Sequence, residues 1–221
     1  MIAIVDYGMG NLRSAQKGFE KAGHAATITD DPGIIAAAHA VVLPGVGAFK
    51  DCCDGLKARG LVKPILDAAS SGRPFLGICV GLQLLFEESE EGGISKGLGI
   101  LPGRVVRFPD AKKTGLKVPH MGWNTVKPVD GRAAFLFKDI PPEPYLYFVH
   151  SYYARPADDS LVLATCTYGV EFAAMVGRDN IFAFQFHPEK SQKHGIGLLR
   201  AFGDLIQGGL IQGGLIKGDT G

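Results

Sequence analysis

Cys79 is the residue whose surroundings most strongly indicate chemistry. It follows an apolar run and stands between Gly77 and Gly81 in the segment 74–85, PFLGICVGLQLL. A strand that turns sharply into a helix, with small residues two positions before and after the apex, forms a nucleophile elbow, here with cysteine in place of serine. The start of a helix stabilises a thiolate through its dipole and its free N–H groups. The segment therefore predicts a nucleophilic cysteine, although an inert, buried cysteine between packing glycines would have the same pattern.

A base for this nucleophile is available in QFHPE, residues 185–189, at the end of another apolar run. In extended backbone, side chains two residues apart point to the same side, and Pro188 is excluded from the interior of a helix. His187 and Glu189 are therefore expected to project together from the end of a strand. Glu189 would then orient the imidazole ring toward Cys79. The alternative for His187 is a hydrogen-bonded surface histidine.

Backbone N–H groups for an oxyanion hole are available in the segment 43–49, LPGVGAF. Loops at the carboxyl ends of parallel strands line the ligand sites of open α/β sheets. We expect the backbone of Val46 and Gly47, together with that of Val80 after the nucleophile, to bind a developing oxyanion. A plain glycine-rich turn between a strand and a helix would also have this sequence.

Metal and nucleotide chemistry have little support. The HxE pattern at 187–189 fits a zinc deaminase only together with PCxxC, which the sequence lacks. The segment 6–13, DYGMGNLR, begins like a dinucleotide-binding GxGxxG, but Arg13 stands at the third glycine position. Neither a metal nor a cofactor is predicted.

The elements that must position these groups alternate between strand and helix. Apolar runs predict strands at 2–5, 25–29, 40–43, 74–78 and 181–186, and three- and four-residue spacing predicts helices at 12–22, 32–38, 50–59, 61–70, 80–88 and 196–206. Asn11 is expected to cap the first helix. The alternation predicts an α/β fold with a doubly wound, mainly parallel sheet and flanking helices.

After Gly92 the pattern changes to short strands among Gly and Pro. Strand-like pieces are expected at 98–101, 105–108, 116–118, 124–126, 145–150, 161–166 and 170–176. We expect the first four to form hairpins that add antiparallel strands at one edge of the sheet, and the other three to be further strands. One domain is predicted over 1–207, followed by a mobile, glycine-rich tail over 208–221 that continues an LIQGG repeat.

Composition restricts the partners and the location. With 23 Lys and Arg against 22 Asp and Glu, the net charge is +1, which provides no overall field to attract nucleic acid or an anionic membrane. The four cysteines contain no CxxC pair, which fits a reducing compartment. The first residues, MIAIVDYG, lack the basic stretch of a signal peptide. A cytoplasmic location is predicted.

Three segments, PGVGAF, GICVGLQLLFEES and QFHPEKS, resemble in their order and placement the class I (triad) glutamine amidotransferases. The resemblance extends from Ile2 to about Ile206 and implies that L-glutamine is the substrate. It implies that Cys79 attacks the carboxamide carbon, with His187 and Glu189 completing the triad, and that a γ-glutamyl thioester is hydrolysed to glutamate with release of ammonia. It also implies a glutamine-binding pocket formed by Gly47, Gln83, Ser151 and Tyr152.

Further segments, DYGMGNLRS, PHMGWN and YFVHSYY, are similar to the glutaminase-subunit family of the imidazole glycerol phosphate synthases. This similarity implies a heterodimer with a (β/α)₈ cyclase subunit, which would use the ammonia to form imidazole glycerol phosphate and AICAR in L-histidine biosynthesis. The residues expected at the contact are Asn11, Met121, Trp123, Asn124 and Lys190. Two other functions stay open at this point: a free-standing cysteine hydrolase similar to a γ-glutamyl peptidase, and a non-catalytic interaction subunit.

Overall fold

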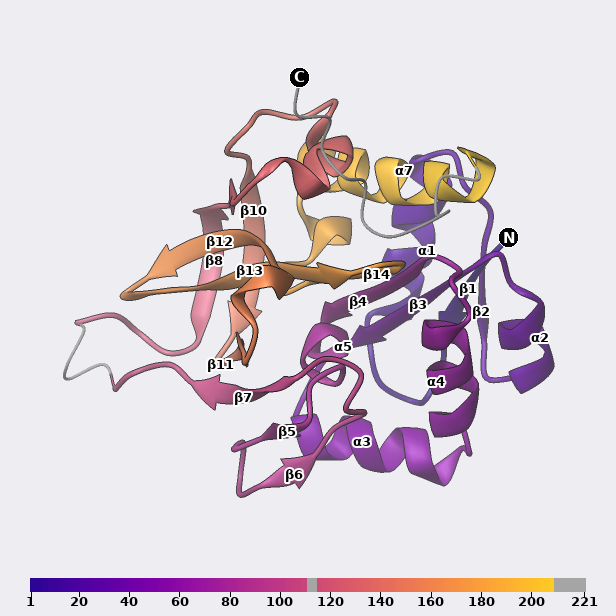
Figure 1. Cartoon of the computed structure of the whole chain (residues 1–221), viewed down its shortest axis with the longest axis horizontal. Coiled ribbons are helices and arrows are strands. Elements are labelled where there is room, and N and C mark those ends of the chain that lie inside the picture. Colours follow the sequence, from indigo (N-terminus) through magenta and orange to yellow (C-terminus); the bar gives the residue numbers. More distant parts are fainter. Residues whose placement is uncertain (111–114, 209–221) are drawn as a thin grey trace.

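The computed structural model describes residues 1–110 and 115–208, and its centre is an eight-stranded sheet with the order β2-β1-β3-β4-β14-β13-β12-β9 (Figure 1). Five neighbouring strands are parallel: β2 (Ala26–Thr29), β1 (Ile2–Val5), β3 (Ala40–Gly45), β4 (Phe75–Cys79) and β14 (Ile181–Phe184). The other three continue the sheet antiparallel at one edge: β13 (Val170–Arg178), β12 (Val162–Tyr168) and β9 (Lys127–Pro128). The predicted fold class is confirmed.

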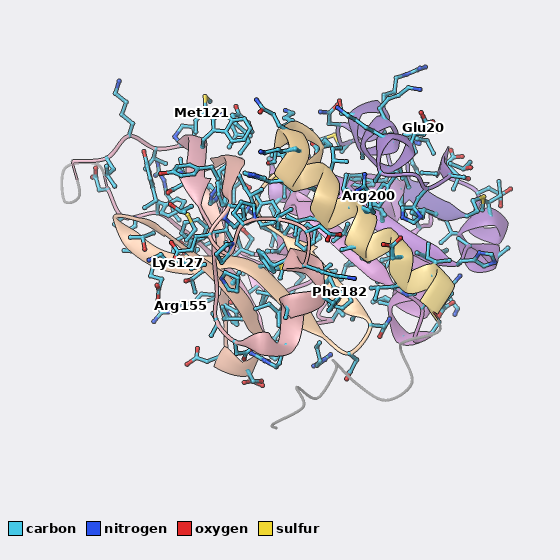
Figure 2. The ribbon with its side chains drawn as sticks, turned by 90° about the horizontal axis from the view of Figure 1, so that it is seen from above. Glu20, Met121, Lys127, Arg155, Phe182 and Arg200 are labelled. Atoms are coloured by element: carbon cyan, nitrogen blue, oxygen red, sulfur yellow. The ribbon has the colours of Figure 1, made fainter. Side chains whose placement is uncertain are left out.

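Helices cover both faces of the parallel strands. On one face lie α1 (Leu12–Lys21) and α7 (Gln192–Gly208), and on the other lie α2 (Pro32–Ala37), α3 (Phe49–Ala58), α4 (Val62–Ser70) and α5 (Val80–Gln83) (Figure 1). Arg200 of α7 (Figure 2) donates a hydrogen bond to the carbonyl of Ala22, after α1, at 3.4 Å. Strands β1, β3, β4 and β14 are buried along their whole length, as expected for strands between two helical layers.

Two smaller sheets lie beside the large one. One pairs β10 (Tyr145–His150) with β8 (His120–Thr125), and the other has the order β11-β7-β5-β6, formed by Tyr152–Pro156, Gly103–Arg107, Glu88–Ser89 and Ser95–Lys96. The expected pieces at 105–108 and 124–126 therefore belong mainly to these small sheets rather than to the edge of the large one. Among the described residues, the connections include the 3-10 helices η1 (Gly131–Phe137), η2 (Asp159–Leu161) and η3 (Pro188–Lys190).

The predicted helix at 80–88 is shorter in the structure, and the strand expected at 98–101 is absent. Helix α5 ends at Gln83, and the side chains of residues 84–86 are fully buried. The carbonyls of 84–86 accept hydrogen bonds from the N–H groups of 98–101 instead of from a further helical turn. Both predictions are wrong for one reason: each segment provides the backbone partners that the other one needs.

Other sequence predictions have mixed outcomes. Residues 116–118 form no strand, and the Asn11 side chain makes no capping hydrogen bond at the start of α1. The tail predicted over 208–221 lies, beyond Gly208, outside the described residues. None of the helices in the described parts of the chain has the length and apolar character needed to span a membrane.

Candidate active site

Cys79 occupies a strained turn between β4 and α5. Its backbone has φ 56° and ψ −112°, in a region that residues with a Cβ rarely adopt. Space for this turn depends on Gly81, where an added Cβ would lie 1.8 Å from the carbonyl oxygen of Leu43. At Gly77 an added Cβ would lie 2.8 Å from the carbonyl oxygen of Gly81. The geometry expected of a nucleophile elbow is therefore present, with the sulfur held at the start of a helix.

His187 and Glu189 follow β14, the strand next to β4. The Nδ1 atom of His187 lies 2.8 Å from Oε1 of Glu189, and the two side chains are 1% and 2% exposed. The backbone N–H of His187 donates to the carbonyl of Tyr147 in β10, which fixes the segment against the small sheet. The structure thus brings together the His and Glu that the HxE spacing placed on one side.

The second ring nitrogen of His187 is the atom available to Cys79. This Nε2 is buried and has no hydrogen-bond partner of standard geometry among the described residues. Burial disfavours the charged imidazolium, but interaction with the Cys79 sulfur and the hydrogen bond to Glu189 outweigh it and raise the pKa of His187 to about 10. Glu189 and the Cys79 sulfur therefore favour the protonated form of His187.

A chain of amide side chains continues from Cys79. Nε2 of Gln185 lies 3.9 Å from the Cys79 sulfur, and the Gln185 oxygen accepts a hydrogen bond from Nε2 of Gln83 at 3.1 Å. Gln83 also donates to the carbonyl of Tyr152 at 2.9 Å. Gln185 was not singled out from the sequence as a site residue; its position two residues before His187, on the same side of an extended segment, is the signal that would have found it.

A cavity of about 300 Å³ joins these groups. Its lining includes residues that the sequence predicted from four separate segments: Val46, Gly47, Cys79, Val80, Gln83, Ser151, Tyr152 and His187. Glu189 is not part of the lining; it lies behind the imidazole that it contacts. The predicted nucleophile, base and pocket residues therefore share one cavity.

Four further lining residues were missed: Glu91, Pro119, Val149 and His150. Glu91 accepts a hydrogen bond from the N–H of Phe49 at 2.8 Å, at the start of α3. In the sequence it belongs to the acidic run 87–91, EESEE, which is typical of a solvated loop. Glu91 differs from Glu87 and Glu90, which also accept backbone hydrogen bonds, in that it lines the cavity.

The expected oxyanion segment borders the cavity. Gly47 has φ +92°, which glycine adopts without strain. The carbonyl of Val46 accepts a hydrogen bond from the thiol of Cys52 at 3.5 Å. Val80 begins α5, so its N–H is one of those without a partner inside the helix. The role of these groups as oxyanion donors stays a prediction.

Three of the five residues expected at a partner contact are exposed near the β8–β10 sheet. Met121 and Trp123 are 63% and 45% exposed, and Met121 projects from the outer side of the molecule in Figure 2. The Trp123 ring meets Tyr147 edge to face at 6.0 Å, and the exposed Lys190 lies over the same Tyr147 ring at 5.9 Å.

The other two expected contact residues are less exposed. Asn124 is half-buried and donates to the carbonyl of Thr167. Asn11 is half-buried directly before α1, which packs against η3, the segment that ends at Lys190.

The described residues contain no group of three or more His, Cys, Asp or Glu arranged to hold a metal ion. Fold and site together define a class: an α/β protein with a cysteine elbow at the end of a parallel strand and a buried His–Glu pair at the end of the next one. This arrangement suits nucleophilic attack on an acyl carbon, with proton transfer to the leaving group.

Known proteins narrow this class. A family model described as "Glutamine amidotransferase class-I" matches residues 3–203. The imidazole glycerol phosphate synthase subunit HisH of Syntrophotalea carbinolica is 60% identical over 208 residues, which cover 93% of this chain and 100% of that protein. The HisH subunit of Geobacter sulfurreducens is 54% identical over 92% of this chain and 98% of its own length. The chain therefore belongs to the class I glutamine amidotransferases, in the family of imidazole glycerol phosphate synthase subunits named HisH.

Solved structures have the same fold at lower sequence identity. A structure described as a glutamine amidotransferase superposes with a TM-score of 0.71 at 18% identity, covering 94% of this chain and 100% of the other. The structure of PurLQS from Thermotoga maritima gives a TM-score of 0.69 at 20% identity, covering 91% of this chain and 96% of the other. These likenesses support the fold alone.

Proposed function

We propose that this protein is the glutaminase subunit of an imidazole glycerol phosphate synthase. It hydrolyses L-glutamine to glutamate and ammonia and passes the ammonia to a (β/α)₈ cyclase subunit, which forms imidazole glycerol phosphate and AICAR in L-histidine biosynthesis. The observation that carries this proposal is the cavity that joins Cys79, His187 and the predicted glutamine-binding residues in a chain 60% identical to a HisH subunit.

The chemistry follows from the positions of the side chains. The Cys79 thiolate adds to the carboxamide carbon of glutamine, and the backbone N–H groups of Gly47 and Val80 bind the oxyanion. His187 then gives its proton to the departing ammonia, and the collapse leaves a γ-glutamyl thioester on Cys79. Water, deprotonated by His187, hydrolyses the thioester to glutamate. Glu189 keeps the imidazole in the required orientation throughout.

Gln83, Ser151 and Tyr152 are proposed to hold the polar groups of glutamine. All three line the cavity beside Cys79, and Gln83 is already fixed by its hydrogen bond to the Tyr152 carbonyl. A cavity of about 300 Å³ with a few convergent polar groups suits a single small polar ligand. Neither a metal nor a cofactor is needed for these steps.

The partner is proposed to dock on the exposed side of the β8–β10 sheet. Trp123 and Met121 provide exposed apolar area there, and Lys190 adds a charge beside Tyr147. Large aromatic side chains surrounded by polar groups are typical anchors of interfaces. We further propose that residues 1–207 form the glutaminase domain, that the heterodimer is cytoplasmic, and that Asn11 and Asn124 contribute to the contact.

Glutamine hydrolysis with and without the partner tests this function. We expect the isolated chain to be slow, and the cyclase with its ligand bound to raise kcat by about 10²–10³-fold, a change as large as one oxyanion donor contributes. Glutamate release is measured at saturating glutamine, with a cyclase that cannot bind its ligand as the control. Full turnover by the isolated chain would contradict the proposal and indicate a free-standing cysteine hydrolase.

A further inference from the structure

A line of buried polar side chains connects β8 with the glutamine pocket. Nδ1 of His150 lies 2.9 Å from the carbonyl oxygen of Tyr152, and Nε2 of His150 lies 3.1 Å from Nδ1 of His120. Nε2 of His120 lies 3.3 Å from the amide nitrogen of Asn124. None of these contacts was anticipated from the sequence, in which the two histidines stand 30 residues apart.

The backbone at the two ends fixes the direction of every hydrogen bond in this line. A carbonyl oxygen only accepts, so Nδ1 of His150 carries the hydrogen, and in a neutral ring Nε2 is then the acceptor. His120 must therefore donate from Nδ1 and accept at Nε2. At the other end, the Asn124 oxygen accepts from the N–H of Thr125 and its nitrogen donates to the carbonyl of Thr167, which leaves that nitrogen as donor to His120.

Both histidines are held in the neutral form that this pattern requires. His120 stacks between the rings of Tyr168 and Phe148, with centroid distances of 4.1 and 4.8 Å, and meets the Phe108 ring edge to face at a centroid distance of 6.2 Å. Burial lowers the pKa of His120 to about 4 and that of His150 to about 3. An added proton would place two donors face to face within the line and break it.

The line begins on the strand that carries the proposed docking surface. Side chains alternate along β8, so Met121 and Trp123 face outward while His120 faces the interior and Asn124 is half-buried. The line ends at the Tyr152 carbonyl, which also accepts from Gln83. Through Gln83 and Gln185, the hydrogen-bonded contacts continue to the Cys79 sulfur.

We propose that His120 and His150 are positioning residues that tie β8 to the glutamine pocket, by holding the Tyr152 carbonyl where it orients Gln83 for substrate binding. The inference rests on the proposed function for the identity of the substrate and the partner. The hydrogen bonds from Asn124 to the Tyr152 carbonyl have only one possible arrangement of donors and acceptors. A movement of β8 on docking therefore cannot be compensated by reversing a hydrogen bond within the line, and it changes the hydrogen bonding at Tyr152.

Two substitutions of His120 separate this role from simple packing. In His120→Asn the amide nitrogen takes the place of the His120 Nδ1 atom and still donates a hydrogen bond to Nε2 of His150. In His120→Gln the amide takes the place of the His120 Nε2 atom instead, so His150 loses its donor. Compared in the full chain with the cyclase present, His120→Gln is expected to have a KM for glutamine roughly tenfold above that of His120→Asn, with similar kcat, since one buried hydrogen bond to the pocket is lost. Unfolding midpoints of both variants serve as the stability control.

A spectroscopic measurement on the free protein provides the second readout. Imidazole ¹⁵N shifts are expected to report His120 and His150 as neutral rings protonated at Nδ1, and His120→Gln is expected to move the Nε2 resonance of His150. Protonation of His150 at Nε2, or equal KM values for the two variants of an active enzyme, would overturn the inference. Failure of the proposed function is distinguishable, because it is seen in the unsubstituted protein, as full turnover without the cyclase or as no glutamine hydrolysis at all, while the ¹⁵N shifts still decide the hydrogen-bond pattern.

Discussion

The parallel sheet and the β8–β10 sheet build the two sides of the site in different ways. On the first side, backbone conformation sets the geometry. Cys79 lies in a strained turn at the end of β4, which Gly81 makes possible, and both β4 and its neighbour β3 are buried throughout. On the second side, side-chain hydrogen bonds set it, through His150, His120 and Asn124. Met121 and Trp123 of this second side are exposed.

Because of this difference, the residue proposed to react with glutamine and the pocket wall proposed to respond to the partner lie on different sheets. A nucleophile fixed by buried backbone cannot shift without disturbing the core. A pocket wall held by a few directional hydrogen bonds can shift when a partner binds the exposed side of its strand. We therefore expect a rigid half, the parallel sheet that holds Cys79, and a responsive half, the β8–β10 sheet, which shifts when the partner docks.

Gly81→Ala tests the rigidity of the first half and should have the largest effect. The added Cβ would lie 1.8 Å from the Leu43 carbonyl oxygen, so the elbow must move or β3 and β4 must separate. We expect a loss of about 3 kcal/mol in the free energy of unfolding, measured by urea denaturation, together with loss of glutaminase activity. Gly131→Ala is the control, since nothing lies near its added Cβ; a change beyond about 0.5 kcal/mol there would be unexpected. A Gly81→Ala protein of normal stability and activity would contradict the tight elbow.

Glu189→Gln tests the charged pair that the rigid half carries. We expect kcat to fall about 10²-fold, because His187 loses the group that orients and stabilises its protonated form. Burial opposes the charge on His187, but Cys79 and Glu189 raise its pKa to about 10, above its ordinary value of 6.5. The resulting stabilisation is fully present below pH 6.5 and is lost as the pH rises toward 10, since the folded protein binds a proton there that the unfolded chain does not.

The pH dependence of unfolding measures this contribution. Urea denaturation of the parent between pH 6 and pH 10 is expected to show a larger fall in stability than denaturation of Glu189→Gln, in which the pKa of His187 is lower. Identical pH slopes for the two proteins would mean that Glu189 does not stabilise the imidazolium.

Trp123→Ala tests the responsive half and should have a smaller effect than Gly81→Ala and Glu189→Gln. We expect the dissociation constant of the complex with the cyclase to rise about 30-fold, as when an aromatic anchor contributing about 2 kcal/mol is truncated, with no change in the stability of the free protein. Ile94→Ala is the matched control, because Ile94 is an exposed apolar residue at 69% exposure in a different region, between β5 and β6. Equal affinity for the parent and Trp123→Ala would remove this side of β8 from the interface.

The same two halves differ in how well the sequence predicted them. The parallel strands and their helices follow from periodicity, and the elbow follows from the glycines around Cys79, because local backbone rules decide both. The short helix α5 was predicted too long, since its limit depends on residues 98–101, which have no local signal in the segment 80–88. A pattern within one segment cannot predict which backbone carbonyls of that segment accept hydrogen bonds from a distant one.

The site shows the same limit. The HxE spacing predicted the contact between His187 and Glu189, but the backbone differs from the expected strand end, because Glu189 lies in the 3-10 helix η3. Gln185, Glu91 and the pair His120 and His150 were missed, because their roles depend on contacts between segments far apart in the chain. The spacing of His120 and His150 in the sequence gives no sign that they are in contact. The contact arises from the pairing of β8 with β10, which places the two residues opposite each other.

Cys79→Ala, assayed in the complex with the cyclase under two nitrogen sources, tests the central claim most directly. With glutamine, formation of imidazole glycerol phosphate should fall by about 10⁴-fold or more, since the nucleophile is gone. With added ammonium, the same complex should retain the rate of the parent, because the cyclase needs only ammonia. Loss of both activities together would contradict the division of labour between the two subunits, and retention of the glutamine-dependent rate would show that Cys79 is not the nucleophile.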